Sequence, residues 1–255
     1  MLDVVSLAIK GVSHSYGRNE VLRDIDLNID GEGLIGILGP NGAGKTTLMK
    51  IIAGLLKPTK GDVLIDGSSI NGLSPSERAK LVTYVSPFIN LSMNITVIDY
   101  LTMGRYPWIK LSLSKEDYGV LEYVINSFNL HRFLHRYLSE LSSGELSRVI
   151  IARAISQGTK VVLLDELISF LDLGHQIRTL KKLKELAKGR MIMVSTHVLI
   201  PTLNYVDKVV LLKGGNLVKF GDPRKDINDS DLSSLYGVKL KVLREGSNIL
   251  LDIVE

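Results

Sequence analysis

A glycine-rich turn at residues 39–46 carries the clearest chemistry in this sequence. It matches the pattern G-x-x-x-x-G-K-[ST], between an apolar run at 34–38 and a helix-period stretch at 45–56. Glycines let successive N–H groups turn toward a phosphate chain, while the helix start and Lys45 add positive charge. The Thr46 hydroxyl is placed to bind Mg²⁺. Although a plain tight turn is the alternative, we expect a nucleotide at Gly39, Pro40, Asn41, Gly42, Ala43, Gly44, Lys45, Thr46 and Thr47.

Two adjacent carboxylates follow a second apolar run, at 161–164. In a parallel sheet the carboxyl end of such a strand faces the same crevice as the phosphate loop. Asp165 is therefore expected to hold Mg²⁺ through water. Glu166 points to the other side of the strand and is a candidate to orient and deprotonate the attacking water. The alternative is an acidic pair that caps the following segment.

The spacing of apolar residues indicates which elements position these groups. Stretches with helical periodicity occur at 45–56, at 176–188 and in a block from about 96 to 157, with helix starts marked by Thr96-x-x-Asp99 and Ser114-x-x-Asp117. Their alternation with strands predicts an α/β fold with a parallel sheet. Strands are expected at 4–9, 21–29, 34–38, 63–65, 81–85, 161–164, 191–194, 209–212 and 217–220.

Composition excludes several classes of protein. The 255 residues include no cysteine, which removes disulfides and thiolate metal sites, and 45% are hydrophobic, enough for a full-sized core. No apolar run is long enough for a membrane helix and no leader is recognisable, so we expect a cytoplasmic chain. The net charge of +4 is not clustered beyond the wet face of the 176–188 helix, and no nucleic-acid partner is expected. The mean hydropathy of +0.19 hints at apolar surface for a membrane partner.

A third motif indicates which kind of phosphate-loop protein this is. Leu141-Ser142-Ser143-Gly144-Glu145, followed by an Ile-Ala-Arg-Ala helix, resembles the signature sequence of ABC transporter ATPases. Ser142-x-x-Glu145 is also an ordinary capping box, and the two interpretations are compatible. The resemblance implies that Ser142, Ser143 and Gly144 reach across a homodimer to the γ-phosphate of ATP held by the other subunit.

The resemblance covers almost the whole chain and implies further roles. Tyr16 stands where the family has an aromatic residue that stacks on adenine, and 169–172 resembles the D-loop. His197 resembles the switch histidine that contacts the γ-phosphate and would act in catalysis with Glu166 and Lys45. The family fold is a single P-loop NTPase domain over 1–255: a RecA-like parallel sheet, an N-terminal antiparallel β region, a helical insert at about 88–157 and a C-terminal extension at about 221–255.

Residues 104–108 and the helix after Ser114 resemble the insert of the ATPase subunits that serve importers of iron–siderophore complexes, haem and cobalamin. Residues 221–238 resemble the end of the same subunits. The resemblance implies a subunit on the inner face of the cell membrane that hydrolyses ATP for a membrane permease. An extracytoplasmic binding protein would take part indirectly. The apolar surface suggested by the mean hydropathy is then expected on the insert and on residues 86–96, where the permease would dock.

Several residues depart from the family pattern. Ser86-Pro87 follows Tyr84-Val85 where the family has a proline and then a glutamine, so Pro87 cannot make the usual polar contact, and Asn90 is a possible substitute. Ser143, Glu145, Leu167 and Val198 replace the family's glycine, glutamine, proline and aspartate. We expect slowed or differently coupled hydrolysis. The alternatives are a non-catalytic ATP-gated module, or a soluble ABC ATPase of iron–sulfur assembly or nucleic-acid repair.

Overall fold

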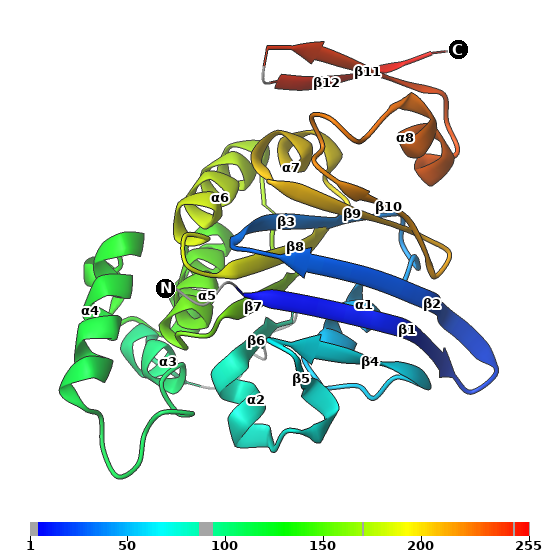
Figure 1. The fold of residues 1–255 in the computed structure, drawn as a ribbon. Coiled ribbons are helices and arrows are strands. Elements are labelled where there is room, and N and C mark those ends of the chain that lie inside the picture. The colour runs from blue at the N-terminus through cyan, green and yellow to red at the C-terminus, as the bar shows by residue number, and fades with distance from the viewer. Residues whose placement is uncertain (1–4, 87–93, 170, 247, 255) are drawn as a thin grey trace.

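The centre of the fold is a six-stranded sheet in the order β10-β9-β3-β8-β7-β6 (Figure 1). The structure is a computed structural model and describes residues 5–86, 94–169, 171–246 and 248–254. Neighbouring strands from β6 to β9 run parallel, and β10 is antiparallel to β9. β3 and β7 are almost wholly buried, as their unbroken apolar runs predict. The strands are β3 (Gly33–Leu38), β6 (Val82–Val85), β7 (Val161–Asp165), β8 (Met191–Thr196), β9 (Lys208–Lys213) and β10 (Asn216–Gly221).

An antiparallel sheet covers one face of the central sheet, with helix α1 (Lys45–Ile52) in the same core. Its order is β2-β1-β4-β5, and the alternating apolar residues of β1 and β2 point inward to this core. Leu48, Ile51 and Ile52 of α1 are fully buried in it. The strands are β1 (Ser6–Tyr16), β2 (Asn19–Asp30), β4 (Lys60–Ile65) and β5 (Ser68–Ser69).

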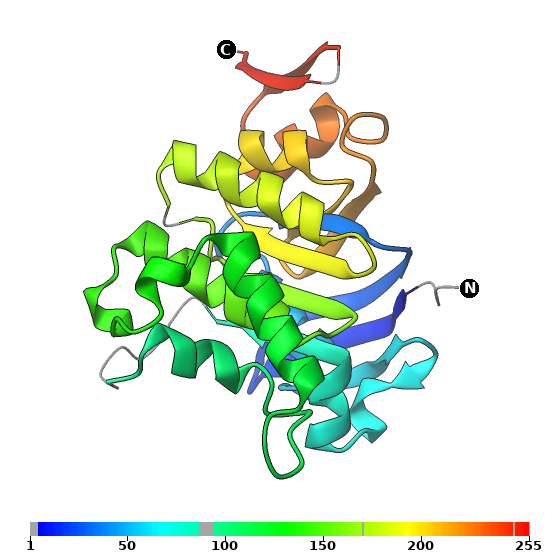
Figure 2. The same ribbon diagram turned by 90° about the vertical axis from the view of Figure 1, so that its left-hand side faces the viewer.

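Helices cover the opposite face of the central sheet (Figure 2). Thr96, Ser114 and Ser142 each cap the start of one of these helices. As their spacing predicts, each side chain accepts a hydrogen bond from the backbone N–H three residues later. The expected helical block at 96–157 is broken into several helices, because Pro107 and the turn at Asn129 interrupt it. The helices on this face are α3 (Val97–Met103), α4 (Lys115–Phe128), α5 (Ser143–Ser156), α6 (Leu173–Leu186) and α7 (Leu199–Tyr205), with 3₁₀ turns at His131–Phe133 and Leu138–Glu140.

The remaining elements differ in part from expectation. The stretch at 45–56 stays helical only to Ile52, and Leu81 ends helix α2 (Pro75–Leu81) instead of opening β6. A 3₁₀ turn lies at Ile70–Gly72. The chain ends in α8 (Asp229–Tyr236) and a hairpin of β11 (Leu240–Glu245) and β12 (Asn248–Ile253), none of which was predicted. Of the helices described, none combines the length and apolar character that crossing a lipid bilayer demands.

Candidate active site

The phosphate loop joins β3 to α1 and requires glycine. Gly42 and Gly44 have φ of 77° and 100°, in the left-handed region that favours glycine. A Cβ on Gly39 would lie 2.1 Å from the carbonyl oxygen of Leu212 on β9. Because Gly44 caps α1 without a side chain, the N–H groups of the first turn remain available to an anion.

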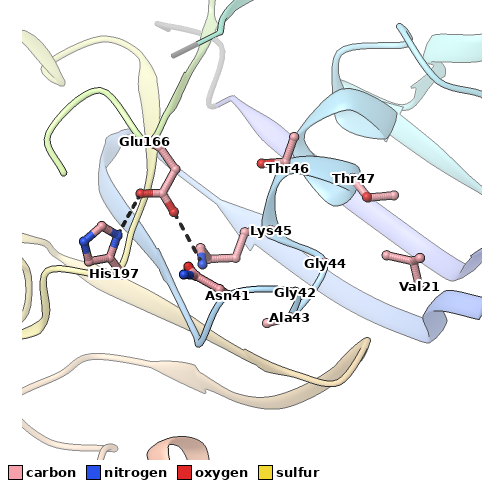
Figure 3. Close-up of a pocket in the computed structure, with 10 residues that line it drawn as sticks. All are labelled: Val21, Asn41, Gly42, Ala43, Gly44, Lys45, Thr46, Thr47, Glu166 and His197. Atoms are coloured by element: carbon pink, nitrogen blue, oxygen red, sulfur yellow. Dashed lines mark hydrogen bonds and ion pairs between the residues drawn. The ribbon is translucent and has the colours of Figure 1, made fainter. Parts of the chain in front are cut away.

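The loop forms one wall of a cavity of about 460 Å³ (Figure 3). Such a volume is ample for the phosphates of a nucleotide. Glu166 and His197, which follow β7 and β8, close the other side. The lining residues are Val21, Asn41, Gly42, Ala43, Gly44, Lys45, Thr46, Thr47, Glu166 and His197.

Lys45 lies across the loop with its side chain almost fully buried. Its ammonium donates to the carbonyl oxygens of Gly39 at 2.8 Å and Pro40 at 3.2 Å, and lies 3.4 Å from the Glu166 carboxylate. Two carbonyls and one carboxylate compensate the desolvation of this cation. The arrangement holds a positive charge against the cavity, where it can neutralise a phosphate.

Asp165 is fully buried at the end of β7 and is held by three hydroxyl groups. Thr46 donates to its Oδ1 at 3.1 Å, Tyr84 donates to its Oδ2 at 2.9 Å, and Ser195 donates to Oδ1. Burial and the adjacent carboxylate raise the pKa of the Tyr84 hydroxyl, so it stays a donor. The sequence does not mark Tyr84 or Ser195 as part of the site, because only the order of β6, β7 and β8 brings them to Asp165.

The donor set beside the loop fits Mg²⁺. The Thr46 hydroxyl and the Asp165 carboxylate present two oxygens of the kind that this ion prefers. Among the described residues, no cluster of three or more acidic, histidine or cysteine side chains could hold a metal by itself. Mg²⁺ usually takes one or two protein oxygens and completes its coordination with phosphates and water.

Glu166 has the backbone of a residue under constraint. Its φ of 53° is uncommon for a residue with a side chain, and its N–H donates to the Ser195 hydroxyl at 3.0 Å. The carboxylate receives a hydrogen bond from Ser169 and lies 3.2 Å from His197 Nδ1 and 3.4 Å from Lys45. The three residues predicted to be catalytic therefore converge on one point of the cavity (Figure 3).

Other predicted residues lie outside this cavity. Tyr16, at the end of β1, is 51% exposed, and its ring is nearly perpendicular to that of His14 with 4.8 Å between centroids. The carbonyl oxygens of Gly39 and Pro40 accept hydrogen bonds from Lys45, but neither residue lines the cavity. Pro87 and Asn90 lie outside the described residues, so the consequence of the missing glutamine stays a prediction.

Ser142, Ser143 and Gly144 form a separate group at the start of α5, and none of them lines the cavity around Lys45. Ser142 and Glu145 make the expected capping box: the Glu145 carboxylate accepts from the Ser142 N–H at 3.0 Å and from its hydroxyl at 2.9 Å. These bonds lower the pKa of Glu145. The Glu145 carboxylate, which stands where the family has a glutamine, therefore binds the capping residue of its own helix.

Comparison with known proteins identifies the family. The model of the ABC transporter family matches residues 22–169, more than half of the chain. An uncharacterised ABC transporter ATP-binding protein of Methanocaldococcus jannaschii is 38% identical over 93% of both chains. The petrobactin import ATP-binding protein of Bacillus subtilis is 31% identical over 92% of this chain and 94% of its own, and the hemin import ATP-binding protein of Thermobifida fusca is 30% identical over 98% and 89%.

A solved structure confirms the fold class. An inward-facing ABC transporter, described as of the metal-chelate type, superposes with a TM-score of 0.82 and covers 98% of this chain and 97% of its own at 24% identity. The P-loop core expected from the phosphate loop and the parallel sheet is therefore correct. The chain belongs to the ABC transporter family and is an ATP-binding ATPase of the importer type.

Proposed function

We propose that this chain powers the uptake of an iron–siderophore, haem or cobalamin-type molecule through a membrane permease. The observation that carries the proposal is the convergence of Lys45, Glu166 and His197 on one cavity beside the phosphate loop. The similarity to petrobactin and hemin import proteins supports the substrate class. The chain would lie on the inner face of the cell membrane, with an extracytoplasmic binding protein taking part indirectly.

Hydrolysis of ATP follows from the geometry of these residues. The phosphate loop and Lys45 hold the β- and γ-phosphates and offset their charge. Glu166 orients a water molecule for in-line attack and accepts its proton, and His197 contacts the γ-phosphate from the end of β8. Thr46 and Asp165 would hold Mg²⁺, which offsets the charge that develops on the phosphate oxygens.

A homodimer would complete the nucleotide site. Ser142, Ser143 and Gly144 do not line the cavity of their own chain, and in this proposal they contact ATP bound by a second copy. The capped start of α5 suits this role because its first N–H groups favour an anion. Tyr16 would stack on adenine at the open side of the same site.

Docking to a permease is supported by exposed apolar side chains between α3 and α5. Several large ones occur in residues 106–137, as expected for the segment that contacts a membrane partner. They are Tyr106, Trp108, Leu111, Tyr118, Tyr123 and Tyr137. Residues 87–93, the other part of the predicted docking surface, lie outside the described residues.

Affinity purification from detergent-solubilised membranes tests the proposal. The tagged chain is expected to recover an integral membrane permease, and the complex should release phosphate from ATP in a single turnover. Recovery of soluble partners alone would contradict the transporter assignment. Normal ATP affinity with no phosphate release over hours would instead support a non-catalytic ATP-gated module.

A further inference from the structure

A second cavity is lined by residues from the end of α4 and from α5 and α6. These helices lie on the same face of the central sheet (Figure 2). The cavity's volume of about 290 Å³ is just below the range of sites for drug-sized ligands, so it suits a smaller molecule. We call it the α5–α6 cavity. Its lining residues are Ser127, Phe128, Asn129, Gly144, Arg148, Ile151, His175, Arg178, Thr179, Lys182 and Leu183.

Helical periodicity brings these side chains to one place. On α5, Gly144, Arg148 and Ile151 are spaced four and three residues apart and share one face. On α6, the polar residues His175, Arg178 and Lys182 recur at the same spacing. The basic face of α6, expected to be merely solvated, is therefore in part a wall of the cavity.

The charged side chains that line the cavity are basic. Arg148, Arg178 and Lys182 line it, and its lining residues include no acidic side chain. Lys182 is paired with Glu185 at 3.1 Å on the outside of α6, and His175 is paired with Asp172. Neither arginine forms an ion pair with another described residue, and two guanidinium groups in one cavity are well suited to a carboxylate or phosphate.

The floor of the cavity is apolar. Phe128, Ile151 and Leu183 are buried and line it beneath the charged groups. Ser127, Asn129 and Thr179 add hydrogen-bonding groups at the sides. An inorganic anion would leave this floor in contact with water, whereas an organic anion would cover it and bury apolar surface.

We propose that the α5–α6 cavity binds a small organic anion, with a carboxylate or phosphate held by the two arginines and Lys182 and with an apolar body against the floor. The site is distinct from the position proposed for ATP of a second copy. Arg148 and Ile151 lie about 6 and 10 Å along α5 from Gly144, so the cavity extends along the helix away from its capped end.

Titration calorimetry on the full chain, without ATP or Mg²⁺, tests the binding site. Benzoate and phenyl phosphate are the charged probes, and benzamide is the uncharged control. At least one charged probe is expected to bind with a dissociation constant on the order of 1 mM or tighter, and benzamide at least tenfold more weakly. Comparison of the two charged probes shows whether carboxylate or phosphate is preferred.

Neighbouring residues of α6 provide a matched pair of variants. Lys182→Glu should weaken binding of the charged probe at least tenfold, because it inverts a charge at the cavity wall. Lys181→Glu makes the same change in net charge, but Lys181 lies over the ring of Tyr205 and does not line the cavity. Equal effects of the two variants, equal binding of benzamide, or displacement of the probe by ATP would overturn the assignment.

The cavity shares Gly144 with the proposed contact to ATP, and the ring of His175 lies close to that glycine. We therefore expect the bound anion to change ATP turnover at least twofold, an effect that rests on the proposed function. The effect should be absent in Lys182→Glu and present in Lys181→Glu. If the probe binds but ATP turnover is unchanged, the cavity does not regulate hydrolysis. If the probe does not bind, the cavity is not an anion site.

Discussion

At the scale of single residues, Glu166 decides whether the cavity is a hydrolytic site. Its carboxylate lies between the Lys45 ammonium and His197, so it can act on a water molecule placed near the γ-phosphate. Glu166→Gln keeps the size of the side chain and removes the base. We expect ATP affinity to stay within about threefold and steady-state hydrolysis to fall at least tenfold.

The control for this variant is Glu185→Gln, which makes the same exchange on the outside of α6. Its turnover should match that of the unmodified chain in a coupled phosphate-release assay, with ATP affinity measured separately by calorimetry. An unchanged turnover number in Glu166→Gln would take this residue out of the mechanism.

The residues around Glu166 also show which parts of a site can be predicted from sequence. The phosphate loop and the acidic pair are local patterns, so their spacing along the chain predicts their proximity in space. Ser195 and Tyr84 bind Asp165 from 30 and 81 residues away. Nothing in a run of sequence marks such a serine or tyrosine, because only the order of the parallel strands brings them to the carboxylate.

At the scale of elements, a buried ion pair joins the end of α3 to the start of α4. Arg105 Nε donates to Asp117 Oδ1 at 2.8 Å, and both side chains are about 95% buried. Arg105 also donates to the carbonyl oxygen of Ser156 at the end of α5. Hydrogen bonds from the Ser114 hydroxyl and N–H, with a further contribution from Arg105, lower the pKa of Asp117 to about 2.

Because that pKa is lowered on folding, the ionised carboxylate stabilises the folded state above the ordinary pKa of aspartate, and this contribution is lost as the pH falls toward 2. Asp117→Asn should lower the free energy of unfolding by about 3–5 kcal/mol at pH 7, and the difference from the unmodified chain should shrink between about pH 4 and pH 2. Urea unfolding at pH 7 and pH 3 measures both values. Glu122→Gln, at an exposed position of α4, is the control, and a pH-independent difference for Asp117→Asn would contradict the assignment.

Elements could be predicted wherever their apolar spacing is strong. The buried strands of the central sheet and the capped starts of α3, α4 and α5 were expected from sequence and are confirmed. Helix α8 was missed because Asp229–Tyr236 is rich in serine and aspartate, which favour caps and turns over helix interiors. Its Asn228-x-x-Asp231 cap and the left-handed Gly237 after it were the available signals.

At the scale of the whole molecule, exposed apolar side chains fall into two main regions. One is the segment at 106–137, which lies in the insert where the family resemblance led us to expect apolar surface. The other is the C-terminal hairpin, where Leu243, Leu250 and Ile253 are exposed, and this region was not foreseen. The two regions lie at opposite ends of the molecule in Figure 1, so a single flat partner would not cover both.

The position of the signature residues predicts a dimer that depends on ATP. Ser142 and Ser143 are exposed at the start of α5, and they do not line the nucleotide cavity of their own chain. A second copy would bring its own cavity to this helix start, and the phosphates would then link the two chains. Hydrolysis would release them, so blocking hydrolysis should trap the dimer.

We therefore expect Glu166→Gln with ATP and Mg²⁺ to elute at about twice the monomer mass of 28.1 kDa in size-exclusion chromatography with light scattering. ADP should leave the same variant monomeric, because it lacks the γ-phosphate that the second chain would contact. Adding Lys45→Ala, which removes the cation held against the phosphates, should abolish the dimer by weakening ATP binding. A Glu166→Gln chain that is saturated with ATP yet remains monomeric at tens of micromolar would show that the start of α5 does not bind nucleotide across a homodimer.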